Sequence, residues 1–294
     1  MSNDLGSHKP IGIFDSGLGG LAVVQQVRRL LPGEDILYLG DTARQPYGPR
    51  PLEEVRRFSL EISAYLVQEG VKMVVIGCNT ASVAGSGAIQ SYLPEIPVLD
   101  IVQPGVRAVL SPGYHRRIGV WGTEITIASK AYDRLIHEAY PDAAVIGVAC
   151  SRLLRLAEKG QIDDKPYLRE LAQTYLQPLS ESQIDTLVLG CTDLTCIRDV
   201  IEGVVDPRVR VIDPAEELVR KAGEILAERG LLRQPSGGSS ICRFVITGAD
   251  LTGFAHFAAR FLHLREVDVA WVDLAELRQA LIKRARTLRG ATCY

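Results

Sequence analysis

Two cysteines in this 294-residue chain stand in closely similar surroundings. Cys78 and Cys191 each follow a short apolar run and a glycine, in the segments Val-Val-Ile-Gly-Cys-Asn-Thr and Leu-Val-Leu-Gly-Cys-Thr-Asp. A thiolate is a competent base as well as a nucleophile. With a thiolate on one face of a carbon atom and a thiol on the other, one group can remove a proton while the other returns one. The pair therefore predicts two-base proton transfer that needs no cofactor.

The apolar run before each cysteine, rich in β-branched residues, is typical of a buried parallel strand. The polar residues that follow then lie beyond the carboxyl end of the strand, where open α/β sheets bind ligands. The spacing also repeats, since Asp100 lies 22 residues after Cys78 and Asp213 lies 22 residues after Cys191. We interpret this pattern as an internal duplication that gives two similar α/β lobes, each with one cysteine at a strand end.

Strand and helix patterns alternate along the chain, as in α/β domains. Strands are expected at 11–14, 36–39, 74–77, 97–100, 117–121, 144–149, 187–190, 209–212, 243–247 and 266–272. Helices are expected at 21–31, 52–68, 82–92, 128–139, 165–180, 214–229, 250–263 and 274–288. Residues 1–9 are predicted to be a disordered leader, and residues 231–240, rich in Gly and Ser, a flexible excursion.

Composition argues against several classes of function. A net charge of −2 is unlike that of a nucleic-acid or membrane-surface binder, which is usually basic. No apolar run approaches the roughly 20 residues that cross a bilayer. The polar N-terminus lacks a hydrophobic signal region, so a cytoplasmic location is predicted. The six cysteines include no Cys-x-x-Cys pair and suit neither a secreted disulfide framework nor a zinc site, so no metal is expected.

A single cysteine after an apolar strand is more often a core residue than a catalyst. The matched pair, with polar residues at each strand end, favours the catalytic interpretation. Asp15, at the end of the first strand, could orient Cys78 or accept its proton. In the second lobe Asp193 or Glu158 would have the corresponding role.

Four motifs give the chain a resemblance to a known family. They lie at residues 13–20, at 40–44 with 46–48, at 77–82 and at 190–192. In these segments the sequence resembles the glutamate racemases, members of the cofactor-independent aspartate/glutamate racemase superfamily. The similarity extends from residue 10 to about residue 262.

The resemblance implies two pseudo-symmetric, doubly wound parallel-sheet domains with the active site in the cleft between them. Residues 1–103 plus 214–294 would form the lobe that carries Cys78, and residues 104–213 the lobe that carries Cys191. It also implies a homodimer, no cofactor, and interconversion of L- and D-glutamate for peptidoglycan.

By the same resemblance, Cys78 and Cys191 are the two bases and Asp15 supports Cys78. The amino-acid substrate would be held by residues from the motifs and from the second lobe, namely Asp15, Ser16, Pro46, Tyr47, Gly48, Asn79, Thr80, Thr123, Thr192 and Asp193.

One departure leaves alternatives open. Family members usually have His directly after Cys-Thr, whereas this chain has Asp193. An imidazolium would favour the Cys191 thiolate, but an ionised carboxylate raises the pKa of a neighbouring thiol. Aspartate racemases have an acidic residue here, so an aspartate or broader acidic amino-acid racemase is the first alternative. A weakly active or non-catalytic amino-acid-binding relative is the second.

Overall fold

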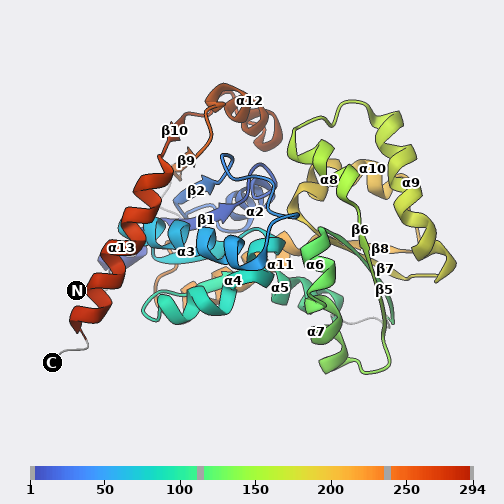
Figure 1. The fold of residues 1–294 in the computed structure, drawn as a ribbon, viewed down its shortest axis with the longest axis horizontal. Helices are drawn as coiled ribbons and strands as arrows, with labels where there is room; N and C mark the ends of the chain where they lie inside the picture. Colours follow the sequence, from blue (N-terminus) through green and yellow to red (C-terminus); the bar gives the residue numbers. More distant parts are fainter. Residues whose placement is uncertain (1–3, 111–115, 235–239, 292–294) are drawn as a thin grey trace.

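The computed structural model describes residues 4–110, 116–234 and 240–291 (Figure 1). Within these residues the strands form a six-stranded sheet of order β10-β9-β2-β1-β3-β4 and a four-stranded sheet of order β6-β5-β7-β8. All neighbouring strands pair in parallel. The prediction of two parallel-sheet α/β domains is therefore confirmed.

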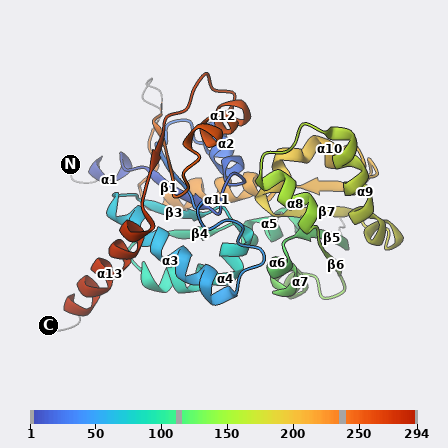
Figure 2. The same ribbon diagram turned by 45° about the horizontal axis from the view of Figure 1, so that its top comes forward.

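The first sheet draws strands from both ends of the chain. Its members are β1 (Ile11–Asp15), β2 (Ile36–Gly40), β3 (Met73–Ile76), β4 (Val98–Asp100), β9 (Cys242–Ile246) and β10 (Val269–Trp271). The second sheet is formed by β5 (Arg117–Gly122), β6 (Ala144–Ala149), β7 (Thr186–Gly190) and β8 (Arg210–Ile212). The two sheets lie side by side in different parts of the molecule (Figure 2).

Helices cover both faces of each sheet because every buried strand presents apolar side chains on both sides. On the first sheet, one face packs against α2 (Leu21–Leu30), α11 (Pro214–Glu228) and α12 (Leu251–Leu262). The other face packs against α3 (Leu52–Gln68), α4 (Asn79–Tyr92) and α13 (Leu274–Ala291). The helices α11, α12 and α13 come from the last third of the chain, so that part returns to the first sheet.

The second sheet is covered in the same way. One face packs against α8 (Ser151–Glu158), α9 (Lys165–Glu181), the 3-10 helix η1 (Thr192–Ile197) and α10 (Arg198–Glu202). The other packs against α5 (Val102–Val109) and α7 (Ala131–Ala139), with α6 (Glu124–Ala128) beside them. Among the described residues, no helix combines the length and the hydropathy that a membrane crossing requires.

Several helix boundaries differ from the sequence-based expectation. The helix expected from residue 82 begins at Asn79, because Cys78 is its N-cap and the Cys78 Sγ accepts a hydrogen bond from Ala81 N at 3.5 Å. The helix expected over 128–139 begins only at Ala131, as α7, and the separate helix α6 ends at Ala128, since Lys130 between them adopts a left-handed conformation with φ of 53°. The short elements α5, α6, α8, η1 and α10 were not predicted.

Two segments were predicted to lack structure, and the first of them differs from that expectation. Residues Asp4–Ser7 form the short helix α1, so the prediction of a disordered leader is wrong there. Of the excursion expected at 231–240, residues 235–239 lie outside the described part of the chain.

A buried ion pair joins the amino-terminal ends of the first-sheet strands. Lys72 Nζ lies 2.5 Å from Glu34 Oε2, and both side chains are only 1% exposed. The same ammonium donates to Ser7 O at 2.6 Å and to Leu231 O at 2.9 Å. Lys72 therefore ties α1 and the end of the α11 segment to the sheet.

We expect Lys72→Met to lower the free energy of unfolding by about 3–5 kcal/mol, because Glu34 would stay buried without a counter-charge. Urea denaturation measures this. A double variant, Lys72→Met with Glu34→Leu, should regain most of the loss, since apolar residues of similar volume replace a buried pair at little net cost. A single variant with the wild-type urea midpoint would show that the pair does not stabilise the fold.

Candidate active site

The two cysteines lie at the carboxyl ends of β3 and β7, the central strands next to β1 and β5. Their residues are 5% and 7% exposed, for Cys78 and Cys191 respectively. Burial raises the pKa of both thiols, and the next contribution is the charge of Asp15 for Cys78 and of Asp193 for Cys191. The charge of Cys78 also raises the pKa of Cys191. The two thiols are therefore electrostatic neighbours, and their surroundings favour the protonated form of each.

Asp15 forms a direct link between the two lobes. Its Oδ1 accepts a hydrogen bond from Gly17 N at 2.8 Å, within the turn that follows β1. Its Oδ2 accepts one from Thr192 Oγ1 at 3.1 Å, from the residue after Cys191. Burial raises the pKa of Asp15 against these hydrogen bonds, which lower it. The structure thus brings the Asp15 carboxyl to the centre of the cleft, between the two strand ends.

Asp193 is the acidic partner of Cys191. The Cys191 Sγ donates to Asp193 Oδ2 at 3.4 Å, while Asp193 Oδ1 has no hydrogen-bond partner among the described residues. Burial raises the pKa of Asp193 well above its usual value, with further contributions from the charges of Asp15 and Glu158. A carboxyl group in this state can accept the thiol proton and also hold one.

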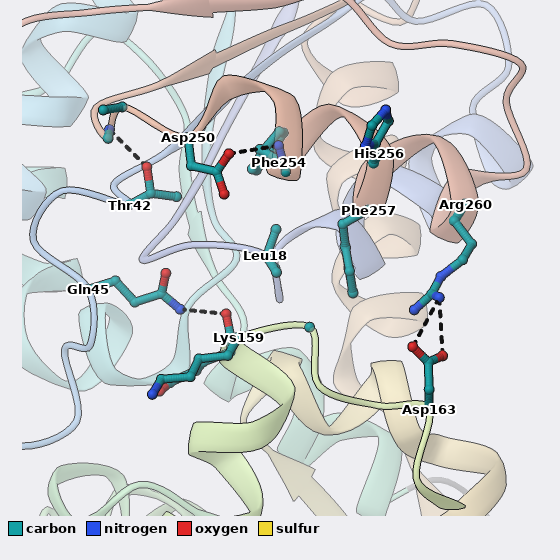
Figure 3. Close-up of a pocket in the computed structure, with 15 residues that line it drawn as sticks. Leu18, Thr42, Gln45, Lys159, Asp163, Asp250, Phe254, His256, Phe257 and Arg260 are labelled. Carbon is teal, nitrogen blue, oxygen red and sulfur yellow. Dashed lines mark hydrogen bonds and ion pairs between the residues drawn. The ribbon is translucent and has the colours of Figure 1, made fainter.

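Glu158 stands at the edge of this cluster, at the end of α8. Burial raises the pKa of its carboxyl to about 7, and the charge of Asp15 adds to the increase. Its carbonyl oxygen accepts from Gln45 Nε2 at 3.4 Å, and the donor Gln45 and the neighbouring Lys159 are labelled in Figure 3. Glu158 also lines a cavity of about 610 Å³ between α12 and the segment that follows α8.

The predicted substrate-binding residues of the first lobe meet the second lobe through hydroxyl and amide groups. Asn79 Oδ1 accepts from the Tyr132 hydroxyl at 2.8 Å, and Asn79 Nδ2 has no partner among the described residues. The hydroxyls of Thr80 and Thr123 lie 3.0 Å apart. A buried amide donor without a partner is unusual in a folded protein and indicates a position that a ligand can satisfy.

The loop after β2 supplies the remaining candidates. Gly48 lies against the second lobe, since a Cβ on it would be 3.1 Å from the Thr123 Cβ. Tyr47 is buried and Pro46 is half-buried in this loop, while Ser16, which follows β1, is also buried. The Tyr47 hydroxyl donates to Asp41 Oδ2 within its own lobe, so this hydroxyl is turned to the loop and not to Thr123.

Some residues around the site were not predicted. Tyr132 fixes the Asn79 amide, and the Tyr38 hydroxyl donates to Gly17 O at 2.6 Å, holding the turn that carries Asp15. Both lie outside the motifs, so no local pattern indicated them. Asp41 and Arg44 stand inside a motif and form a buried ion pair. Arg44 also pairs with Glu61 from the following helix, which lies outside the motif.

Most of this arrangement is buried in the structure. Cys78, Cys191, Asp15 and Asp193 are each at most 7% exposed, whereas Glu158 is only half-buried. Within the described ranges, no group of three or more His, Cys, Asp or Glu side chains is arranged to hold a metal ion. Two thiols with adjacent carboxyl groups on opposite lobes can exchange protons with a carbon atom held between them.

The chain is similar to known proteins over most of its length. A family model described as Asp/Glu/Hydantoin racemase matches residues 11–222. A glutamate racemase of Geobacter metallireducens is 42% identical over 267 residues, which cover 90% of this chain and 97% of that protein.

Solved structures agree with this result. A glutamate racemase isoform from Bacillus anthracis has a TM-score of 0.86 at 37% identity, covering 91% of this chain and 98% of that one. A Francisella tularensis glutamate racemase, solved in complex with D-glutamate, has a TM-score of 0.82 at 31% identity, covering 92% and 98%. An aspartate racemase of Picrophilus torridus, with a TM-score of 0.52 at 17% identity, shares the fold alone.

These matches confirm the resemblance that the four motifs carry, and with it the prediction of an amino-acid racemase, an isomerase. The chain belongs to the Asp/Glu/Hydantoin racemase family.

Proposed function

We propose that this protein is a cofactor-independent glutamate racemase in which Cys78 and Cys191 are the two bases. The observation that carries the proposal is the pair of buried thiols at equivalent strand ends, each beside a carboxyl group of its own lobe. Its relatives over most of the chain are named glutamate racemases, and one of them was solved with D-glutamate. By the family resemblance, the D-glutamate would be used for peptidoglycan.

The proton steps follow from the carboxyl groups near each thiol. Asp193, which accepts a hydrogen bond from Cys191 Sγ, takes the proton of that thiol, or Asp15, whose charge acts on Cys78, takes the proton of the other, which leaves one thiolate and one thiol. The thiolate removes the α-hydrogen of the substrate, and the electron pair stays on the α-carbon next to the carboxylate. The opposite thiol then protonates the other face of that carbon. The thiolate and thiol have exchanged roles, and the reverse reaction uses the same groups.

The remaining residues would hold the amino acid in place. The free Asn79 amide and the hydroxyls of Ser16, Thr80, Thr123 and Thr192 can donate to its carboxylates, together with the backbone of residues 46–48. Asp15 and Asp193 can accept from its ammonium. Because burial disfavours several negative charges in one cleft, the ammonium would stabilise the ionised form of these carboxyls.

Glutamate is favoured over aspartate as the substrate. The relatives that are more than 30% identical over most of the chain are glutamate racemases, whereas the aspartate racemase shares the fold alone. Asp193 replaces the usual His, but its carboxyl group still contacts the thiol of Cys191 and can exchange a proton with it.

We assign residues 1–103 plus 214–294 to one lobe and residues 104–213 to the other. Sheet membership supports this division, because β1–β4, β9 and β10 share one sheet and β5–β8 share the other. A homodimer in the cytoplasm, without a nucleic-acid or membrane partner, remains our expectation for the working enzyme.

Proton NMR of L-glutamate in D₂O tests the reaction itself. We expect the wild type to exchange the α-proton and to produce D-glutamate. Cys78→Ala and Cys191→Ala should each lower the racemisation rate by at least about 10²-fold, since each removes a general acid–base group. Cys150→Ala is the matched control, because Cys150 is also buried at the end of a strand but lies outside the cluster.

Three other results would contradict the proposed substrate, the proposed activity or the proposed mechanism. Exchange with aspartate and none with glutamate would favour the aspartate racemase. Binding of glutamate without exchange of either substrate would favour the binding protein. Full activity in either cysteine variant would exclude the two-cysteine mechanism.

The role of Asp193 is tested by Asp193→Asn, which keeps the shape of the side chain but cannot accept the proton of Cys191. We expect kcat/KM to fall about 10²-fold or more, and by the same factor for L- and D-glutamate, because the equilibrium constant of racemisation is one. Asp199→Asn, at an exposed surface ion pair, is the control. Unchanged kinetics of Asp193→Asn would remove Asp193 from the mechanism.

Glu158 is expected to make stability depend on pH. Its carboxyl has a pKa of about 7 in the folded chain against a usual value of 4.5, so unfolding releases a proton between these pH values. The free energy of unfolding therefore falls as pH rises through this window. Glu158→Gln should remove the fall and be more stable, relative to wild type, at pH 8 than at pH 5, by up to about 3 kcal/mol. Urea denaturation at both pH values measures the difference, and parallel pH profiles of the two proteins would contradict it.

A further inference from the structure

The loop after β2 is organised around one fully buried carboxylate, Asp41. Its Oδ2 accepts from the Tyr47 hydroxyl and from Arg44 Nε, the latter at 2.7 Å. Its Oδ1 accepts from the hydroxyl of Thr247 at 2.8 Å. Both carboxylate oxygens are thus engaged, and the partner of Oδ1 is more than 200 residues away in the sequence.

Thr247 reaches this position because it follows β9, which pairs with β2. The register sets Ile246 beside Gly40, and Thr247 N donates to Gly40 O at 3.2 Å. The Thr247 hydroxyl also accepts from Ala43 N at 2.9 Å, so its one proton and one of its lone pairs are both used on the loop. The indole of Trp271 donates to Thr247 O at 3.1 Å, which fixes the backbone behind it.

Further contacts of the loop come from its own segment and the helix that follows, and two more come from distant residues. Gly248 N donates to Thr42 Oγ1 at 2.9 Å, and Gln45 Nε2 donates to Glu158 O at 3.4 Å. Arg44 lies over the ring of Phe58 at 4.0 Å and pairs with Glu61, both on α3. Arg50 Nε donates to Arg44 O at 2.8 Å and to Pro46 O at 3.1 Å. Thr247 therefore supplies a restraint from a different part of the chain, beyond the residues 11–222 that the family model matches.

We propose that Thr247 is a positioning residue for racemisation, whose hydroxyl holds Asp41 and thereby sets the place of residues 46–48 in the cleft. This inference rests on the proposed function. It assigns to the C-terminal part of the chain a role in the geometry of the site.

The position of this loop matters because it packs against residues of both lobes. Gly48 lies against Thr123 of the second lobe. Tyr47 packs in the same buried cluster as Cys78. A shift of the loop would thus change its packing against Thr123 and the packing of the cluster that contains Cys78, and small misplacements of positioning groups have large kinetic effects.

Thr247→Val tests the hydroxyl, because valine keeps the shape but can neither donate to Asp41 nor accept from Ala43. We expect kcat/KM for glutamate to fall about 10- to 100-fold, mainly through KM. Thr247→Ser retains the hydroxyl and should stay within about threefold of the wild type. Thr186→Val is the matched control, since Thr186 is also buried and donates to a carboxylate, Asp185, at 2.9 Å, at the opposite end of β7.

A second readout does not require racemisation. Iodoacetamide should alkylate Cys78 faster in Thr247→Val than in the wild type, in Thr247→Ser or in the control, as measured by mass spectrometry of the peptides. Cys150, fully buried elsewhere, should react at one rate in all four proteins. Equal acceleration at Cys150 would mean general unfolding and would overturn the proposal.

Wild-type kinetics and wild-type alkylation of Thr247→Val would also overturn it, as would equal impairment of the valine and serine variants. If the wild type itself did not act on glutamate, the proposed function would fail. The alkylation of Cys78 would then still decide whether Thr247 holds the loop.

Discussion

The site holds two thiols and the carboxyl groups of Asp15 and Asp193 away from water, with Glu158 half-buried beside them, and the rest of the structure depends on this constraint. Burial favours the neutral form of every one of these groups, which is why the pKa values of Cys78, Cys191 and Asp193 all rise. A reactive thiolate can then form only where an acceptor is already in contact with it. Cys191 and Asp193 meet this condition through one hydrogen bond of 3.4 Å.

Such a cluster exists only because two sheets present their carboxyl ends to each other. Within a parallel sheet all strands end at one edge, so short loops from several strands meet there. The loops are joined across the lobes by hydrogen bonds, Thr192 to Asp15 and Tyr132 to Asn79. Behind them, braces such as the Tyr38 hydroxyl on Gly17 connect the loops to the apolar core. The geometry of the site therefore depends on the packing of the core.

The features that could be predicted from the sequence are those with a local pattern of residues. The strands that end in Gly-Cys were predictable, because burial on both faces leaves an uninterrupted apolar run and polar residues at its end. The start of α4 was not, because a cysteine sulfur at the N-cap is not among the usual capping groups. The break at Lys130 was also missed, since lysine has no preference for a left-handed conformation.

The candidate site shows the same limit. The motifs named Asp15, Cys78 and Cys191, which local spacing could indicate. The contact between Thr192 and Asp15 joins residues 177 apart in the sequence, and that of Thr247 with Asp41 joins residues 206 apart. Contacts of this kind depend on which strands are neighbours, and one sequence carries no local signal for them.

Asp193 shows why the type of a residue alone does not predict its role. Its type alone suggested a weaker partner than an imidazole, but burial raises its pKa so that the carboxyl can hold a proton. A site built from such carboxyls leaves more of its charge compensation to the substrate's ammonium, and on the proposed function it therefore favours amino acids over dicarboxylates that lack one.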